Sequence, residues 1–517
     1  MNPGESRTVW ILGDQLGIRN AALETARKGR DRLLFIESRE TFGKLPYHRH
    51  RLMLILSAMR HFAEERRAEG WEIDYHALAE APDMGSVLKL HCEKHRPATI
   101  LLTEPNNHDE SRAARSLSKK LPLTLIASAQ FLCTRGEFEE LAQGKKRLLM
   151  ENFYREMRRR TGLLMEADGS PAGGSWNYDA ENRATFRDWE KSGNPKPCRP
   201  PRRPADRITL EVAADLGRFF PEAVGHAGDF SLPVTRADAL AWLSHFVAER
   251  LPDFGTWQDL MIRGEADMFH SILSPMLNIG LLEPLECAWA AEQAYRTGKA
   301  PLHAVEGFVR QIIGWREFVN GIYWLKMPEY EQVNGLHASR PLPSFFWDGK
   351  TDLNCLRHVL GETLRSGFNH HIQRLMILGN FLLLAGINPQ EALAWFNSFY
   401  VDAHDWVMAA NVLGMALHAD GGFMATKPYA GAAAYIGRMS NYCDGCGYDP
   451  NLKSGPGACP FNLLYWNFYD THAERFANNP RTAMPVRSWR KRPEQERRKI
   501  VSEAEEFLRL LAEGKAS

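Results

Sequence analysis

The sequence has no long hydrophobic run, which excludes a chain that crosses a membrane as an apolar helix. None of its apolar stretches approaches the roughly 18 residues that such a helix needs. The first seven residues also lack the basic start, the apolar stretch and the small-residue cleavage site of a secretory signal, so we expect a cytoplasmic protein. Disulfide bonds are therefore not expected among the 8 cysteines.

The chain also has little net charge. Its 64 basic and 63 acidic residues give +1 at pH 7, which argues against a protein that binds polyanions over its whole surface. Only a basic stripe on one face would give useful affinity for nucleic acid. Short basic runs stand at 145–147, 158–160, 199–203 and 487–492.

The first part of the chain has the pattern of a doubly wound α/β domain. Apolar runs at 9–12, 33–36, 73–75 and 100–102 predict parallel strands, and segments near 50–67 and 84–94 predict helices between them. We assign residues 1–135 to this domain. Ligands of such folds usually bind beyond the carboxyl ends of the strands.

The rest of the chain divides into a connector and a helical domain. Residues 136–234 form the predicted connector, because 165–206 are rich in Gly, Pro, Asn and Arg. Within it, 176–183 are too aromatic for a free linker and are expected to dock between domains. From 235 to 517 apolar residues recur with a period of about 3.6, which predicts an all-α domain.

The sharpest motif consists of four cysteines. Cys443 and Cys446 are two residues apart, Cys459 precedes Pro460 after a Gly- and Pro-rich loop, and Cys355 lies far upstream. Soft thiolate ligands suit an iron–sulfur cluster or structural zinc. We favour iron–sulfur because the fourth ligand is remote and aromatic residues crowd the loop. Zinc and a chance spacing of buried cysteines are the alternatives.

Polar residues also interrupt the apolar helical part. His370 and His371 stand beside Arg374, and Asp402 and Asn411 follow in similarly apolar surroundings. Neighbouring residues on a helix point about 100° apart, so the two histidines cannot easily bind one metal ion together. Buried polar groups need partners, and a large heterocyclic cofactor would supply them.

Several of these motifs resemble the photolyase/cryptochrome superfamily. Its flavin-binding motifs are similar to SILSPML at 271–277, IIGWREF at 312–318, HHIQR at 370–374 and KPYA at 427–430. The four cysteines, GDQL at 13–16 and NYDAENR at 177–183 resemble its iron–sulfur bacterial branch, the prokaryotic (6-4) photolyases and related cryptochromes. The resemblance covers nearly the whole chain, and the cysteines make the branch assignment specific.

The resemblance implies an FAD and a four-iron four-sulfur cluster in the helical domain and an antenna in the α/β domain. FAD would be bound by Ser271, Leu273, Ser274, Trp315, Arg316, Arg374, Asp402 and Asn411. Helix capping is the alternative role of the two serines. The cluster would be held by Cys355, Cys443, Cys446 and Cys459. A 6,7-dimethyl-8-ribityllumazine antenna would contact Asp14, Glu37 and Glu104.

Two tryptophans resemble the inner part of the chain that carries an electron from the surface to the flavin. These are Trp395 and Trp347, for which a place in the core is the alternative. Two residues near the expected flavin site depart from the family pattern. Phe396 stands where relatives tend to have tyrosine, and Met408 stands where some relatives have a carboxylate.

A histidine is the expected catalytic proton donor, because an acid with a pKa near the working pH can give and regain a proton. The resemblance implies that His371 has this role, that His370 orients it or the flavin, and that Tyr429 lines the lesion pocket. Leu375, one helical turn on, stands where eukaryotic relatives have a second histidine.

The function implied is light-dependent repair of (6-4) pyrimidine photoproducts by electron transfer from excited reduced FAD. The partner would be UV-damaged DNA, and we expect a monomer. One alternative is a cryptochrome that signals blue light through flavin photoreduction. Another is an iron–sulfur nucleic-acid-binding module without photochemistry. The basic runs and His371 favour repair, which requires a cationic face and a pocket for a flipped base.

Overall fold

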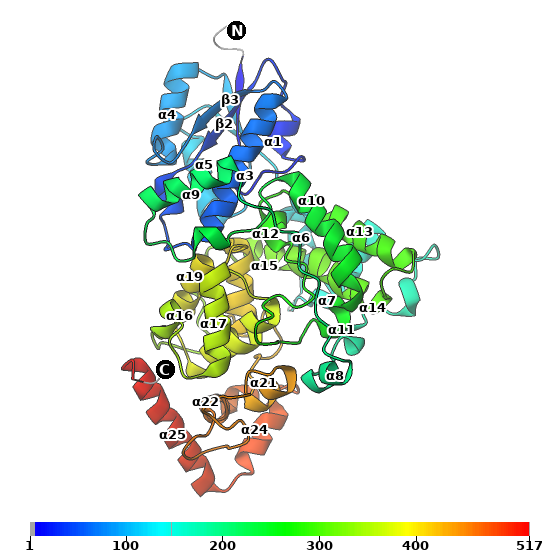
Figure 1. Ribbon diagram of the computed structural model, residues 1–517, viewed down its shortest axis with the longest axis vertical. Coiled ribbons are helices and arrows are strands. Elements are labelled where there is room, and N and C mark those ends of the chain that lie inside the picture. Colours follow the sequence, from blue (N-terminus) through cyan, green and yellow to red (C-terminus); the bar gives the residue numbers. More distant parts are fainter. Residues whose placement is uncertain (1–5, 146, 516–517) are drawn as a thin grey trace.

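A five-stranded parallel sheet forms the N-terminal part of the molecule (Figure 1). The computed structural model describes residues 6–145 and 147–515, so the first five residues and Lys146 of the first basic run lie outside the described residues. The strand order is β3-β2-β1-β4-β5. The strands are β1 (Arg7–Trp10), β2 (Arg32–Ile36), β3 (Glu72–His76), β4 (Thr99–Thr103) and β5 (Leu123–Ile126).

Alternation along the strands places apolar side chains on both faces of the sheet. Val9 and Leu33 pack into the large core on the face of α3 (Arg49–Ala68). Trp10 and Leu34 pack on the other face against α4 (Met84–His95) and α5 (His108–Leu117). This two-sided burial is the physical basis of the doubly wound arrangement. The predicted fold class of this part is confirmed.

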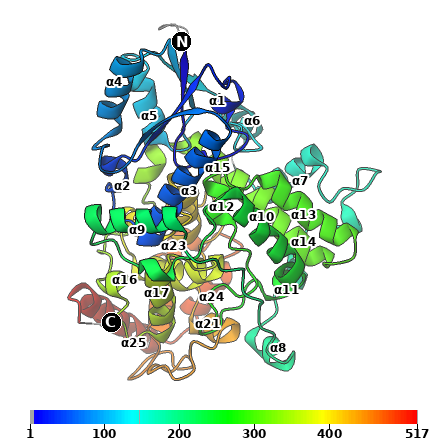
Figure 2. The same cartoon turned by 45° about the horizontal axis from the view of Figure 1, so that its top comes forward.

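The segment predicted as a connector contributes helices that pack on both neighbouring parts. Helix α6 (Arg135–Ala142) begins one residue before this segment and continues into it. The segment also contains α7 (Met150–Thr161), α8 (Phe186–Lys191) and α9 (Arg207–Phe219). Helix α9 packs against α3, below the sheet in Figure 2. Helix α7 packs against the π-helical segment Arg310–Arg316.

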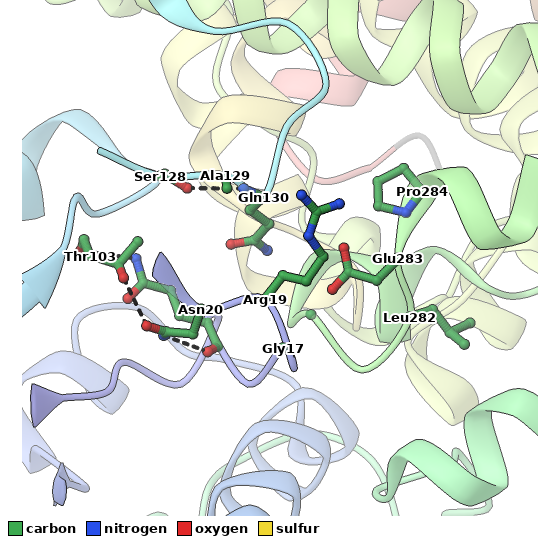
Figure 3. Close-up of a pocket in the computed structure, with 12 residues that line it drawn as sticks. Gly17, Arg19, Asn20, Thr103, Ser128, Ala129, Gln130, Leu282, Glu283 and Pro284 are labelled. Carbon is green, nitrogen blue, oxygen red and sulfur yellow. Dashed lines mark hydrogen bonds between the residues drawn. The ribbon is translucent and has the colours of Figure 1, made fainter. Parts of the chain in front are cut away.

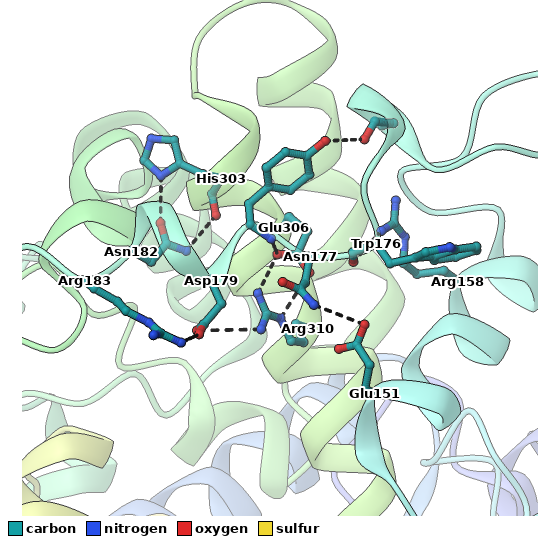
Figure 4. Close-up of polar contacts among 12 residues, drawn as sticks. Glu151, Arg158, Trp176, Asn177, Asp179, Asn182, Arg183, His303, Glu306 and Arg310 are labelled. Carbon is teal, nitrogen blue, oxygen red and sulfur yellow. Dashed lines mark hydrogen bonds and ion pairs between the residues drawn. The ribbon is translucent and has the colours of Figure 1, made fainter.

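Polar contacts anchor the aromatic stretch 176–183 to the helical part (Figure 4). The buried guanidinium of Arg158 donates to the carbonyl of Trp176 at 3.0 Å. Asn182 Nδ2 donates to the carbonyl of His303 at 3.0 Å, and the backbone N–H of Tyr178 donates to Glu306 Oε2 at 3.1 Å. The stretch is therefore docked, and Arg158 of the second basic run serves this contact instead of facing solvent.

From residue 235 to 515 the described chain is helical, as predicted. Its α-helices are α10 (Arg236–His245), α11 (Leu251–Trp257), α12 (Ser274–Asn278), α13 (Pro284–Arg296), α14 (Leu302–Val309), α15 (Glu317–Lys326), α16 (Phe345–Asp348), α17 (Asn354–Ser366), α18 (Asn380–Ala385), α19 (Pro389–Phe399), α20 (Asp405–Ala409), α21 (Ala433–Met439), α22 (Pro460–Thr471), α23 (Ala473–Phe476), α24 (Ala483–Arg490) and α25 (Glu494–Ala512). Two short helices, α1 (Ala21–Glu24) and α2 (Arg39–Phe42), belong to the α/β part. Among the described residues, none of these helices has the length and apolarity to cross a membrane.

Several helices widen into π-helical turns, which often mark functional sites. The segments are Phe246–Arg250, Arg310–Arg316, Gln373–Gly379 and Ala410–Ala416. The last three contain Trp315, Arg316, Arg374 and Asn411, all predicted to bind FAD. The helical periodicity of the sequence gave no sign of these turns.

Candidate functional site

A buried ion pair lies at the centre of the predicted flavin site. Arg374 Nη1 and Nη2 donate to the two oxygens of Asp402 at 2.9 and 3.1 Å. Ser274 Oγ donates to Asp402 Oδ2 at 2.7 Å, and Asn278 Nδ2 donates to the carbonyl of Asp402 at 2.9 Å. Although Ser274 begins helix α12, its side chain bonds across to Asp402 and does not cap the helix.

The ion pair fixes the charge of Asp402. Burial alone would raise the pKa of this carboxyl, but Arg374 and the hydrogen bonds more than offset it, so the pKa lies below its ordinary value. Asp402 therefore stays ionised in the folded protein. It can hold the guanidinium of Arg374 in one direction and accept further hydrogen bonds from a ligand.

Asp402→Asn is expected to lower the free energy of unfolding at pH 7 by about 3 kcal/mol, because it leaves the largely buried guanidinium of Arg374, 16% exposed, without its counter-charge. Since the folded pKa of Asp402 is depressed, its contribution is complete above the unfolded pKa of about 4 and is lost as the pH falls through the folded pKa. The free energies of unfolding of the wild type and the variant, measured by denaturant titration, should therefore converge at acidic pH.

The matched control is Asp405→Asn. Burial raises the pKa of Asp405, so its ionised form is already disfavoured and its loss should cost little. Equal destabilisation by the two substitutions, with no convergence in acid, would contradict the assignment.

The side chain of Gln130 links this site to the α/β part. Its Nε2 donates to the carbonyl of Asp14 at 3.0 Å and to that of Asn278 at 3.1 Å. Arg316 joins the same junction, because it donates to Glu317 at 2.6 Å and to the carbonyl of Gln130 at 3.5 Å. The structure therefore places Arg316 at the contact between the two parts of the chain.

The other predicted flavin ligands have local partners. Ser271 Oγ accepts from the backbone N–H of Leu273 at 3.4 Å. Leu273 is fully buried, and Trp315 is partly buried against the core. Asn411 Nδ2 donates to the carbonyl of Val407, one turn back in its own helix, at 2.9 Å. This leaves the amide oxygen of Asn411 available to another group.

Several polar atoms in this region are buried without a hydrogen-bond partner. They are Arg316 Nε, Trp406 Nε1, His404 Nε2 and both ring nitrogens of His370. Arg316 and Trp406 are neighbours, since the guanidinium carbon lies 5.3 Å from the indole ring centre. Because such atoms cost free energy when unsatisfied, a polar ligand at this place would stabilise the fold. The donor set fits a large heterocycle that carries acceptors.

Three histidines form a cluster next to Arg374. The rings of His270 and His370 are stacked with centres 4.6 Å apart, and His371 meets His270 edge-on at 5.2 Å. His370 is buried, whereas the side chain of His371 is 46% exposed. The two histidines therefore differ in exposure, but ligand atoms of His270, His370 and His371 all lie within 4.8 Å of one another. This differs from the expectation that His370 and His371 could not easily approach one metal ion. His270 precedes the SILSPML motif, and sequence analysis did not single it out.

The titration of this cluster differs from the expectation for His371. Although part of its surface is exposed, the protein atoms packed around the His371 ring and the charge of Arg374 lower its pKa to about 4, so the imidazole is neutral at pH 7. Asp259 Oδ1 lies 3.9 Å from His371 Nε2, and burial with the charge of Asp179 raises the pKa of Asp259 to about 6. Asp259, which sequence analysis also missed, therefore titrates closer to neutral pH than His371 does.

The four motif cysteines converge in the C-terminal part. Cys355 is buried in the first turn of α17, and Cys459 caps the start of α22. Cys443 and Cys446 share a turn closed by the N–H of Cys446 on the carbonyl of Cys443 at 3.1 Å. Burial raises the pKa of Cys355 well above its ordinary value, and the other three thiols raise it further. All four are therefore close enough to interact.

Comparison with known proteins decides the family. The pattern of the deoxyribodipyrimidine photo-lyase-related protein family matches residues 9–232. A (6-4) photolyase from Agrobacterium fabrum is 43% identical over 518 residues, which cover 98% of this chain and 100% of the relative. The chain belongs to the photolyase-related family.

Solved structures agree with this photolyase fold. A bacterial class III photolyase from Agrobacterium tumefaciens matches with a TM-score of 0.56 and 15% identity, over 96% of this chain and 91% of that one. A Synechocystis cryptochrome matches with a TM-score of 0.53 and 15% identity, over 79% and 82% of the two chains. The predicted family and fold class are confirmed. Membership in the family implies a flavin cofactor.

In this photolyase-related protein, a series of aromatic rings leads from the surface to the ion pair. Trp347 is exposed and meets Phe399 edge-on at 5.6 Å, and Phe399 stacks on the buried Trp395 at 5.1 Å. Trp395 contacts Tyr400 at 5.9 Å, and the guanidinium carbon of Arg374 lies 3.9 Å from the ring centre of Tyr400. The two predicted tryptophans thus belong to one series, in which Phe399 and Tyr400 were not foreseen.

The two departures from the family pattern lie beside this series. Phe396 stacks on Tyr400 with ring centres 5.4 Å apart. Met408 is buried in α20, the helix that precedes the π-helical turn of Asn411. Neither side chain takes part in the Arg374–Asp402 pair.

The predicted antenna residues lie at the carboxyl ends of their strands in different settings. Glu37 is buried and accepts from Arg60 Nε at 2.7 Å, Tyr75 Oη at 2.5 Å and the backbone N–H of Leu78 at 3.0 Å. Asp14 accepts from Asn106 Nδ2 at 2.9 Å, and burial raises its pKa to about 6. Glu104 is paired with Arg135 at 3.5 Å and Arg115 at 3.7 Å.

A pocket opens between this end of the sheet and the start of α13 (Figure 3). Gln15, Thr103 and Gln130 line it from the α/β side and Glu283 lines it from the helical side. Asp14, Glu37 and Glu104 are not among its lining residues, although Asp14 and Glu104 directly adjoin two of them. The ends of β1 and β4 thus form a recess, as expected for a doubly wound sheet.

Proposed function

We propose that this protein is a DNA (6-4) photolyase that uses light to repair (6-4) pyrimidine photoproducts. The observation that carries the proposal is the position of His371. It is a partly exposed histidine at one end of the segment whose Arg374 forms the buried ion pair of the flavin site. A lesion held at His371 would therefore lie next to the cofactor.

Lys427 and Arg481 lie within reach of each other's charge, and Arg183, whose charge also reaches Lys427, is paired with Asp179. The pKa of Lys427 is lowered by burial and by the charges of Arg481 and Arg183. Tyr429 belongs to the same region, because burial raises its pKa while Arg481 lowers it. Cations around a pocket that admits a flipped base are what a DNA-repair site requires. We propose that this group meets the DNA backbone and that Tyr429 lines the lesion pocket.

The basic runs at 199–203 and 487–492 are less suited to that role, because several of their arginines have acidic partners. Arg199 pairs with Glu265 at 2.6 Å and Arg203 pairs with Asp238 at 2.7 Å. Arg490 pairs with Glu474 at 2.7 Å. Arginines that are already neutralised release fewer counterions when they meet phosphate.

We propose that Arg374, Asp402 and Ser274 bind FAD, with Ser271, Leu273, Trp315, Arg316 and Asn411 around it. Bound FAD, once reduced and excited by light, supplies the electron that the lesion takes up and later returns. The protein's residues hold the cofactor and control the proton. The buried Arg374–Asp402 pair orients the site, and His371 gives a proton to the lesion and regains it as a hydroxyl group moves between the bases.

We further propose that the four cysteines hold a four-iron four-sulfur cluster. The thiols of Cys443, Cys446 and Cys459 all act on the charge of Cys355, so the four side chains lie in one place. Thiolates are the ligands that iron–sulfur clusters use, and the remote Cys355 and the aromatic residues of the loop favour a cluster over one zinc ion.

A ribityllumazine antenna is proposed at the carboxyl ends of the strands. Asp14 and Glu104 are next in sequence to Gln15 and Thr103, which line the pocket of Figure 3, and a polar ring system bound there would lie beside them. Because the oxygens of Glu37 are occupied by Arg60 and Tyr75, Glu37 would fix these two neighbours for the antenna. We also propose that the protein acts as a monomer.

The test of the function is to illuminate the reduced protein with an oligonucleotide that carries one (6-4) photoproduct and to measure restored thymines by chromatography. Restoration in light and none in the dark is the expected result. Flavin photoreduction without restoration would overturn repair in favour of a photoreceptor. A preparation without flavin absorption bands would overturn both light-driven functions.

Trp395→Phe is expected to slow the photoreduction of oxidised FAD at least tenfold, because it replaces the oxidisable indole between Phe399 and Tyr400 with a phenyl ring that is much harder to oxidise. Repair by chemically reduced enzyme should stay almost unchanged, since that electron does not pass through Trp395. Flavin absorbance under illumination measures the first rate, and Trp289→Phe, at an exposed tryptophan, is the control. Unchanged photoreduction would show a different route, for instance through Trp406 or Tyr435.

A further inference from the structure

A second polar cluster lies in the α/β part, away from the flavin site. Asp74 and His76 are two residues apart on β3, so they share one face of the strand. His91 and His95 are four residues apart on α4, so they share one face of the helix. Helix α4 covers that face of the sheet, and β3 is the edge strand. The fold therefore brings three imidazoles around one carboxylate.

The distances converge on a single oxygen. Asp74 Oδ2 lies 2.5 Å from His91 Nδ1, 3.3 Å from His76 Nε2 and 3.4 Å from His95 Nε2. The ligand atoms of Asp74, His91 and His95 all lie within 4.8 Å of one another. In a tetrahedral zinc site with bonds of about 2.0–2.1 Å, ligand atoms lie about 3.3 Å apart. Two of the three distances match that spacing without any movement.

Hydrogen bonding within the protein does not satisfy this cluster. His76 Nε2 and His95 Nε2 are buried and have no hydrogen-bond partner, although both face the same carboxylate. A hydrogen bond to the other ring nitrogen fixes the orientation of His91, because its Nε2 lies 2.8 Å from Thr8 Oγ1. A fixed imidazole with a hydrogen-bonded far nitrogen is the usual support of a metal-ligating histidine.

We infer that Asp74, His91 and His95 form a zinc-binding site, with His76 beside it to orient Asp74. Two imidazole nitrogens and one carboxylate oxygen, with water in the fourth position, are a zinc ligand set, whereas calcium and magnesium prefer sites made of oxygen atoms. A divalent ion would take the place of the short Asp74–His91 contact and give the orphaned His95 Nε2 a partner. Asp74, His76 and His95 are 12%, 11% and 16% exposed, so the ion can enter from solvent.

The bound ion would link the edge strand β3 to helix α4, which covers it. Edge strands are the least supported part of a sheet, because one side of their backbone has no partner strand. A metal that ties β3 to α4 would raise the stability of the α/β part without touching the flavin site. The site therefore predicts a structural effect of zinc that is separate from repair.

The test is zinc binding by the FAD- and iron-loaded protein in zinc-buffered equilibrium dialysis, with zinc counted by mass spectrometry. Wild type is expected to hold one zinc more per chain than His95→Ala and to gain thermal stability with zinc, a gain that the variant lacks. His76→Gln is a second, milder change that should weaken binding at least tenfold. Repair should be unchanged in both variants.

The matched control is His371→Ala, which removes a histidine from the other cluster that could hold a metal ion. It should keep the additional zinc, and any zinc at the cysteines would be common to all four proteins. Anomalous scattering at the zinc edge should place the ion at Asp74 in crystals of the wild type. Equal zinc content in wild type, His95→Ala and His76→Gln would overturn the site and leave a hydrogen-bonded polar cluster.

Discussion

His371→Ala is expected to reduce (6-4) repair at least a hundredfold, the usual loss when a general acid is removed, while FAD and DNA binding remain. The side chain of His371 is exposed at the edge of the histidine cluster, so its truncation creates no buried cavity. His370 cannot replace it, because His370 is buried and stacks on His270. The loss should appear in the repair yield per absorbed photon.

The pH dependence of repair provides a second readout. In the protein without DNA the pKa of His371 is about 4, so at neutral pH the imidazole carries no spare proton. The phosphates of bound DNA would raise that pKa, and Asp259, whose pKa of about 6 is near neutrality, can share the proton. We therefore expect the wild-type yield to fall as the pH rises, and Asp259→Asn to shift this profile.

The control for His371→Ala is His245→Ala, the same change on the distant helix α10. It should leave the repair yield unaltered. A near-normal yield in a His371→Ala protein that still binds FAD would contradict the role of His371 while leaving the photolyase function intact. A protein that repairs no lesion even as wild type would instead contradict the function itself.

The regular elements of the sheet and its covering helices could be predicted because burial imposes a period on the sequence. The runs at 9–12 and 33–36 correspond to β1 and β2, and the segments near 50–67 and 84–94 correspond to α3 and α4. Strand β5 was missed although three of the four residues of Leu123–Ile126 are apolar.

The residue types indicated which side chains are chemically important. They did not indicate which partners bind those side chains in the folded protein. Arg374 and Asp402 were foreseen separately, whereas their bidentate contact depends on a π-helical turn that no periodicity reveals. Glu37 was predicted at the right end of its strand, yet its bonds to Arg60 come from a helix far along the chain. Such pairings depend on tertiary packing, which a single sequence does not specify.

Cys443→Ser is expected to remove the brown absorbance of the proposed iron–sulfur cluster and to lower the free energy of unfolding by about 4 kcal/mol or more, as the loss of a structural metal does. Hydrogen bonds already join the loop at 441–459 to both neighbouring helices. Asn354 Nδ2 of α17 donates to the carbonyl of Tyr442 at 2.7 Å, and Asn462 Nδ2 of α22 donates to the carbonyl of Pro450 at 2.8 Å. Ligation by the cysteines would add a further link to these contacts, and the substitution would remove that link.

The matched control is Cys198→Ser, because Cys198 is exposed and distant from the motif in sequence. It should keep the absorbance and the unfolding midpoint of the wild type. Iron and sulfide analysis decides the nature of the centre, and about four of each per chain is the expected content. One zinc per chain without sulfide would replace the proposed cluster with a zinc site.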